Sequence, residues 1–308
     1  MIETSKEIIP SAIVCDDVLA GLSRITDASV HLIVTSPPYN ANIDYDNWKD
    51  NLPHAEYLSW MRKVFTECFR VLQAGGRMCL NIDATTNTTE DVDGLVLPLH
   101  VDFTNILREI GFLYRGEVIW CKQNAPGSPT AWGSYGLCSN PRFKRNTEYI
   151  IMAFKGNSKL EGDSTFCDLK PEEFQKWSLT EWRFAPETRK SGHPVPFPRE
   201  LPNRCIKLFS YVGNTVLDPF NGSGTTTTTA FELGRKYLGI DNSELYCTQA
   251  RNEIKNAGNY MKLNLKKSDP DARLFGGYSW IPAPVLLKRS KISKQARGKS
   301  LPSIIPYD

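Results

Sequence analysis

Seven short apolar runs alternate with segments of helical periodicity along most of this chain, and that alternation limits its fold more than any other feature. The runs have the length and composition of buried strands and lie at 12–15, 30–34, 78–82, 117–120, 149–154, 215–217 and 237–240. Helical patterns follow at 55–72, 99–110, 201–210, 225–233 and 244–257. We predict an α/β fold with a doubly wound, mostly parallel sheet.

Length and composition indicate a protein with a substantial core. The 308 residues are 41% hydrophobic, enough for one large domain with appendages or two modest domains. Acidic residues near the start argue against a signal peptide, and no apolar run could span a bilayer, so we expect a cytoplasmic protein without membrane contact. The eight cysteines stand singly, with no CxxC pair, which favours reduced thiols and no metal site.

A glycine-rich turn, "DPFNGSGTT", follows the strand at 215–217. Its glycines let a ligand approach the backbone closely, and the next helix offers unpaired N–H groups. The strand at 237–240 ends in Asp241, where a carboxylate can hold ribose hydroxyls. No lysine follows the glycines, so a phosphate loop is disfavoured. The turn suits a ligand with an adenosine and a cationic amino-acid part; a tight turn without a ligand is the alternative.

A second motif, "TSPPYN", comes directly after the apolar run at 30–34. Two consecutive prolines fix the backbone direction and remove two N–H donors. A Pro-Pro-Tyr run is more often a turn or a short polyproline segment, but such segments rarely follow a buried strand in a chain that also has the glycine turn.

Together, "TSPPYN" and "DPFNGSGTT" resemble the S-adenosylmethionine-dependent amino-methyltransferases of DNA. The catalytic motif precedes the cofactor motif, an order similar to that of the circularly permuted β group of this family. The resemblance covers most of residues 11–257 and includes "HPVPFPRELPNRCIKLFS". It implies a Rossmann-like methyltransferase fold with an inserted target-recognition region, and S-adenosyl-L-methionine as the cofactor.

The resemblance also implies roles for individual residues of the cofactor site. Four would surround the methionine part of the cofactor: Asp218, Phe220, Gly222 and Gly224. Asp241 would take the ribose hydroxyls, and Asp16 would meet the adenine amine. Cys15 stands where the family usually has glycine, so Asp17 is an alternative to Asp16. Phe197 and Pro198 match the segment that closes over the cofactor.

The catalytic residues implied are Ser36, Pro37, Pro38 and Tyr39. An exocyclic amine is a poor nucleophile until its lone pair is freed from the ring and aimed at the methyl group. The Ser36 hydroxyl and the Pro37 carbonyl would accept its two protons, while Pro38 fixes their direction. The Tyr39 ring would stack on a base turned out of the duplex, a role that does not require its hydroxyl.

The catalytic tetrapeptide is residues 36–39, "SPPY". Serine at its first position occurs in the family mainly with the N4 amine of cytosine, and aspartate or asparagine mainly with the N6 amine of adenine. We therefore expect a site-specific, cytosine-N4 DNA methyltransferase whose product is N4-methylcytosine. Methylation of adenine N6 is the alternative. A protein that binds nucleic acid without catalysis is a third possibility, disfavoured because both motifs are intact.

Four regions are predicted: a catalytic half at 1–154, a target-recognition insertion at 155–192, a cofactor-binding half at 193–258, and an extension with a basic tail at 259–308. The expected partner is double-stranded DNA. Candidate contacts are 140–146, the tail, Arg183, Arg189 and Lys190. A cognate restriction endonuclease, where one accompanies the enzyme, would act on the same site. The sequence does not choose between a monomer and a homodimer.

Overall fold

A computed structural model describes residues 7–87, 96–122, 134, 136–141, 143, 145–187 and 198–268. The main strands are β1 (Ala12–Cys15), β2 (Val30–Thr35), β5 (Leu72–Asp83), β8 (Leu113–Lys122), β9 (Thr147–Phe154), β10 (Glu181–Phe184), β11 (Thr215–Asp218) and β12 (Lys236–Asp241). The helices are α1 (Val18–Ser23), α2 (His54–Val71), α3 (Leu99–Ile110), α4 (Pro171–Trp177), α5 (Glu200–Phe209), α6 (Thr225–Glu232) and α7 (Glu244–Ser268). Smaller elements are the pairs β3 (Asp44–Tyr45) with β4 (Trp48–Lys49) and β6 (Thr86–Asn87) with β7 (Val96–Leu97), and a 3-10 turn, η2 (Ser164–Phe166).

The main strands form one sheet in the order β1-β12-β11-β2-β5-β9-β8-β10. Neighbouring strands run parallel except at β9, which is antiparallel to both β5 and β8. The predicted doubly wound, mostly parallel sheet is thus confirmed. Each of the seven apolar runs lies within a strand of this sheet, and each of the five helical patterns matches a helix to within a residue at its start.

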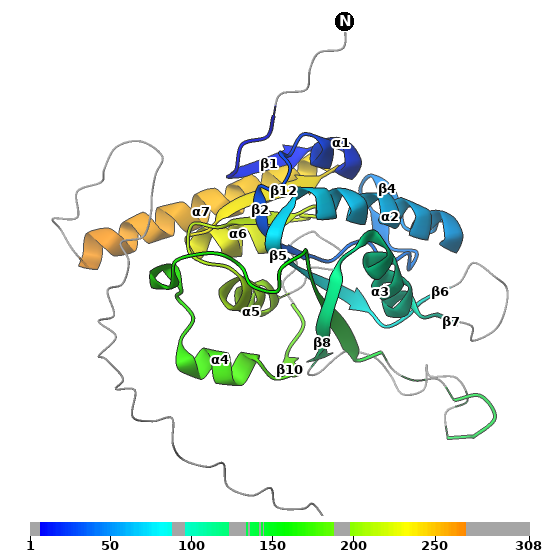
Figure 1. The fold of residues 1–308 in the computed structure, drawn as a ribbon. Helices are drawn as coiled ribbons and strands as arrows, with labels where there is room; N and C mark the ends of the chain where they lie inside the picture. The colour runs from blue at the N-terminus through cyan, green and yellow to red at the C-terminus, as the bar shows by residue number, and fades with distance from the viewer. Residues whose placement is uncertain are drawn as a thin grey trace, which may run out of the picture.

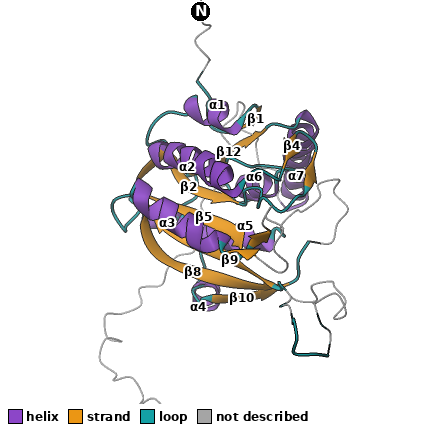
Figure 2. Cartoon of the chain, turned by 90° about the vertical axis from the view of Figure 1, so that its right-hand side faces the viewer, coloured by secondary structure: helices purple, strands orange, loops and turns teal. Residues whose placement is uncertain are grey.

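Helices cover both faces of the sheet (Figure 1). Helices α1, α2 and α3 pack on one face, and α5, α6 and α7 on the other. Figure 2 shows α2 and α3 side by side over β2, β5 and β9. No helix in the described part of the chain has the length and apolar character needed to cross a membrane.

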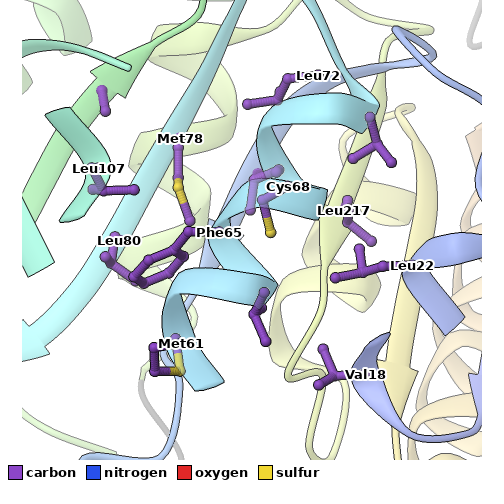
Figure 3. Packing of buried hydrophobic residues seen from close by; sticks show 14 of the residues in the cluster. Val18, Leu22, Met61, Phe65, Cys68, Leu72, Met78, Leu80, Leu107 and Leu217 are labelled. Carbon is purple, nitrogen blue, oxygen red and sulfur yellow. The ribbon is translucent and has the colours of Figure 1, made fainter. Parts of the chain in front are cut away.

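The larger core lies beneath α1, α2 and α3. Helix α2 buries Tyr57, Met61, Phe65 and Cys68, which recur every three or four residues and therefore share one face of the helix. In Figure 3 side chains from α1, α2, α3, β5 and β11 converge, among them Leu22, Phe65, Met78, Leu107 and Leu217. This packing holds in place the strands whose carboxyl ends carry the predicted site residues.

The 155–192 stretch, predicted as an inserted target-recognition region, also contributes a strand to the sheet. Strand β10 extends the sheet by pairing in parallel with β8. Trp182 of β10 is 1% exposed, and its Nε1–H donates to the Trp177 carbonyl at 3.0 Å. The buried guanidinium of Arg235 donates to both oxygens of Asp168, at 2.8 and 2.7 Å. Residues 155–187 are therefore packed against the domain.

Helix α7 continues to Ser268, beyond residue 258 where the sequence suggests that an extension begins. Arg189, Lys190, Phe197 and the basic segment 288–299 lie outside the described residues. The predicted division into four regions stays a prediction.

Candidate active site

A cavity of about 500 Å³ opens at the carboxyl edge of the parallel strands, where ligands of open α/β sheets bind. Eight predicted site residues line it: Asp16, Ser36, Pro37, Pro38, Tyr39, Phe220, Gly222 and Asp241. The structure therefore brings the two sequence motifs together, because β2 and β11 are neighbours in the sheet. Of the described predicted residues, Asp218, Gly224 and Pro198 are not among those that line the cavity.

Asp241 is held by the glycine-rich turn. Its Oδ2 accepts the Gly222 N–H at 2.8 Å, and its Oδ1 accepts the Ser243 N–H at 2.9 Å. Gly222 has a φ of +49°, a left-handed conformation that glycine adopts without strain. Burial raises the pKa of the Asp241 carboxyl, these two bonds oppose that shift, and the charge of Asp46 adds to it. A fixed carboxylate with lone pairs to spare suits a ligand that carries hydroxyl groups.

Asp218 lies behind the cavity wall and is 1% exposed. Its Oδ1 accepts the Thr35 hydroxyl at 2.7 Å and the Phe220 N–H at 3.1 Å. Burial raises the pKa of this carboxyl to about 6, although the bond from Thr35 opposes the shift. Asp218 thus ties the residue before Ser36 to the glycine-rich turn. Its direct contact with the cofactor stays a prediction.

Gly224 is required by helix packing. It has a φ of +89°, and a Cβ built on it would lie 2.6 Å from the Cβ of Ala250. The glycine therefore lets the start of α6 lie against α7.

The carboxylates of Asp16 and Asp17 already have partners within the chain. Asp16 forms an ion pair with Arg24 at 3.0 Å. Asp17 caps α1, where its Oδ1 accepts the N–H groups of Leu19 and Ala20 at 2.9 and 3.3 Å. Both aspartates line the cavity, so the choice between them as the adenine contact stays open.

A loop at 40–50 also lines the cavity, and the sequence analysis missed it. Buried Asp50 accepts the N–H groups of Asn40 and Ala41, each at 2.8 Å, and so holds the start of the loop. Farther along, Asp46 accepts the Ser243 hydroxyl at 2.7 Å, which joins the loop to the end of β12. The readable signal is in "YNANIDYDN", because asparagine tolerates the positive φ of +54° at residue 40.

The proline-rich turn is held from two sides. The Tyr57 hydroxyl of α2 donates to the Pro38 carbonyl. On the other side, Ser36 Oγ and Tyr39 Oη are 2.7 Å apart and share a hydrogen bond. The Ser36 hydroxyl therefore has a defined position at the cavity wall. Acceptance of a proton by the Pro37 carbonyl stays a prediction.

Three further polar residues line the cavity next to Tyr39, and the sequence analysis missed them. The Asn81 amide nitrogen donates to Tyr39 Oη at 2.9 Å and to Glu148 Oε2 at 2.6 Å. Lys122 forms an ion pair with Glu148 Oε1. Burial, and then the negative charge of Glu148, raise the pKa of the Tyr39 hydroxyl well above its usual value. Tyr39 therefore stays protonated at neutral pH.

Aromatic side chains wall both ends of the cavity. Near the glycine-rich turn, the rings of Trp60 and Phe220 meet edge to face, with centroids 5.8 Å apart. At the other end, Trp120 also lines the cavity, its ring stacks on Phe184 at 5.1 Å, and the Lys122 ammonium lies 5.5 Å from the Trp120 centroid. One end thus combines carboxylates with an aromatic wall, as an adenosine with a cationic tail requires, and the other offers flat apolar surface beside polar groups.

Comparison with known proteins identifies relatives over most of the chain. The sequence profile of a DNA methylase family, that of the N6 and N4 methyltransferases, matches residues 30–252. The type II methyltransferase M.MjaI of Methanocaldococcus jannaschii is 31% identical over an alignment of 264 residues, which covers 71% of this chain and 83% of that protein. The DNA adenine methyltransferase YhdJ of Escherichia coli is 28% identical over 282 residues, covering 83% of this chain and 86% of that one. The structure of TTHA0409 of Thermus thermophilus in complex with S-adenosyl-L-methionine has a TM-score of 0.64 and 30% identity, over 80% of this chain and 93% of that one.

Proposed function

We propose that this chain, which belongs to the N6/N4 DNA methylase family, transfers a methyl group from S-adenosyl-L-methionine to the exocyclic N4 amine of a cytosine at a specific site in duplex DNA. The observation that carries the proposal is the position of the Ser36 hydroxyl. It lies 2.7 Å from Tyr39 Oη, at the wall of a cavity that has a carboxylate-rich end and an aromatic, polar end.

The family uses S-adenosylmethionine, and the carboxylate-rich end has groups that suit it. Asp241 would hold the ribose hydroxyls, Asp16 would meet the adenine amine, and Phe220 with Gly222 would contact the rest of the molecule. When bound, the cofactor supplies an electrophilic methyl group on a sulfonium. Phe197 and Pro198 keep their proposed role in closing the site, and Asp218 and Gly224 would support it from behind.

Ser36 would prepare the amine for attack. By accepting an N–H proton, its hydroxyl draws the nitrogen lone pair out of conjugation with the ring and aims it at the methyl group. Pro37 and Pro38 hold the hydroxyl in place, because a turn containing two prolines has little freedom left to lose. The target atom is out of reach within the base stack, so the base would enter the cavity after turning out of the duplex.

The choice of cytosine rests on the short side chain of Ser36. A serine hydroxyl reaches less far from the backbone than the aspartate or asparagine that the family pairs mainly with adenine, and so suits a smaller ring. Methylation of adenine N6 is the second candidate, and the resemblance to YhdJ favours it. The relative M.MjaI is a type II methyltransferase, and this similarity favours a type II restriction-modification system for this chain as well. A cognate restriction endonuclease would then act on the same DNA site.

Contacts with the phosphate backbone would come from exposed cations near the cavity. Arg145 is exposed and lines the cavity. Arg183 is 68% exposed on β10 and forms an ion pair with Glu181. The 155–192 stretch would read the target sequence.

The test is the identity of the methylated nucleoside. Unmodified duplex DNA made by a polymerase is incubated with the enzyme and cofactor carrying a deuterated methyl group, then digested and analysed by mass spectrometry. We expect deuterated N4-methylcytosine, and loss of the signal in Ser36→Ala by a factor on the order of 10². Deuterated N6-methyladenine alone would overturn the choice of cytosine, and no labelled nucleoside would overturn the proposal.

A further inference from the structure

A chain of hydrogen bonds leads from Ser36 away from the cavity into the protein. Ser36 Oγ lies 2.7 Å from Tyr39 Oη, and Tyr39 Oη donates to Glu148 Oε2 at 3.3 Å. Glu148 is 5% exposed, near the start of β9. Its other oxygen, Oε1, pairs with Lys122, so Oε2 is the oxygen at the end of this chain of hydrogen bonds.

The partners of Tyr39 set the direction of this chain. A phenol has one proton to donate, and its acceptors here are Glu148 Oε2 at 3.3 Å and the Asn81 carbonyl at 3.5 Å. The carboxylate is the closer and the charged acceptor, so it is the stronger one. With its proton directed to Glu148, the Tyr39 oxygen accepts the Ser36 proton. Ser36 then keeps a lone pair for a donor in the cavity.

Asn81 fixes the direction in which these hydrogen bonds donate. Its amide nitrogen donates to Glu148 Oε2 at 2.6 Å and to Tyr39 Oη at 2.9 Å, and the opposite orientation of the amide would set its oxygen against the carboxylate. The Asn81 side-chain oxygen is buried, and none of the described residues donates to it. Because Asn81 lines the cavity, a donor from a ligand would complete its bonding.

We propose that Glu148 is the final acceptor of the proton that the target amine loses, and that Ser36 and Tyr39 pass it on. This inference rests on the proposed function. As the nitrogen lone pair forms the new N–C bond, the bond from methyl carbon to sulfur breaks and leaves its electron pair on sulfur. The amine proton moves to Ser36 Oγ, the Ser36 proton to Tyr39 Oη, and the Tyr39 proton to Glu148 Oε2. The products are a neutral methylated amine and a protonated Glu148.

The charged and titratable groups that face Glu148 come from four parts of the chain. They are Lys122 at the end of β8, Asp83 at the end of β5, Arg145 before β9, and Tyr39 of the proline-rich turn. The alternative is that the buried ion pair of Glu148 with Lys122 has only a structural role. The proton relay through Ser36, Tyr39 and Glu148 differs from that role because it requires the Tyr39 hydroxyl and a carboxylate able to take up a proton.

Single-turnover methyl transfer, with cofactor and duplex DNA saturating, separates the two roles. Glu148→Gln keeps the shape and an acceptor oxygen but takes up no proton. Tyr39→Phe keeps the ring, which is all that stacking on a base requires, but removes the hydroxyl through which the proton would pass. We expect each to slow transfer by about 10² or more, with the Kd for S-adenosylmethionine unchanged within about twofold. Glu148→Gln should also change how the transfer rate depends on pH.

The matched control is Glu173→Gln, the same change in a partly buried ion pair with Lys207 that does not line the cavity; its rate should equal that of the wild type. A wild-type rate in either relay variant would overturn the inference, as would a slow Glu148→Gln that keeps the wild-type pH profile. If Glu148→Gln did not fold, Tyr39→Phe would decide alone. Absence of any labelled nucleoside from the wild-type enzyme would instead signal failure of the proposed function.

Discussion

Asp218 serves the site from one layer behind the cavity. Its carboxyl joins Thr35, which precedes the proline-rich turn, to Phe220 of the glycine-rich turn. The sequence predicts an acceptor for the cofactor here, because an aspartate at a strand end before glycines suits that role. It does not reveal the depth of the side chain, which depends on how α6 and the neighbouring strand β2 cover it.

The pKa of Asp218 predicts how its burial affects stability. The folded carboxyl titrates at about 6 and an ordinary one at 3.8, so between these values the unfolded chain has released a proton that the folded chain still holds. The free energy of unfolding therefore falls as pH rises from about 4 to about 6, by at most ~3 kcal/mol from this group. Asp218→Asn should remove that part of the fall, because the amide oxygen still accepts both bonds and does not titrate.

Urea unfolding of the wild type and Asp218→Asn at pH 4 and pH 7 measures this difference. Asp27→Asn, the same change at a side chain that is 75% exposed, is the control and should leave the fall unchanged. An Asp218→Asn variant with the wild-type pH dependence would contradict the assigned cause.

At the scale of elements, periodicity predicts the long strands and helices and misses the short ones. The predicted helix at 99–110 has the observed bounds, because its apolar residues repeat at helical spacing. Strand β10, "EWRF", is four residues long, and its signal is a single alternation in which Trp182 points inward between charged residues. Four residues are too few for periodicity to outweigh a polar setting. The edge position of β10 became visible only through its pairing with β8.

The same limit explains which site residues the sequence could predict. Ser36 and Asp241 stand in contiguous motifs, whereas Asn81, Lys122 and Glu148 are single polar residues in three separate strands. Only the adjacency of β5, β9 and β8 brings them together. A polar residue inside an apolar strand, such as the asparagine in "MCLNID", is the one signal that could have drawn attention to them.

The packing of β10 predicts a large effect of Trp182→Ala. Trp182 is 1% exposed, and the Arg204 guanidinium lies 5.1 Å from its ring. Its loss should reduce the free energy of unfolding by about 3–5 kcal/mol, because a buried ring leaves a cavity when it is truncated.

Thermal and urea unfolding measure that loss. Phe174→Ala, which truncates a ring that is 55% exposed in the same segment, is the control, and its change should stay below about 1 kcal/mol. Equal stability of Trp182→Ala and the wild type would show that residues 155–187 are not part of the core.

At the scale of the whole molecule, the sheet order joins distant parts of the chain into one cavity. The proline-rich turn follows β2 and the glycine-rich turn follows β11, and these strands are neighbours although most of the chain separates them in sequence. The Asn81, Lys122 and Glu148 cluster lies across the sheet on the other side of the Ser36 turn, from β5, β8 and β9. The two ends of one cavity therefore suit different ligands, the methyl donor at one and the target base at the other.

The structure of the enzyme crystallised with S-adenosylhomocysteine tests that claim most directly. We predict ribose hydroxyls within hydrogen-bond distance of Asp241, the amino-acid part extending toward the Ser36 turn, and no cofactor atom in contact with Glu148 or Lys122. A cofactor whose ribose lies against Glu148 and Lys122, or one bound outside this cavity, would contradict the assignment of the two ends.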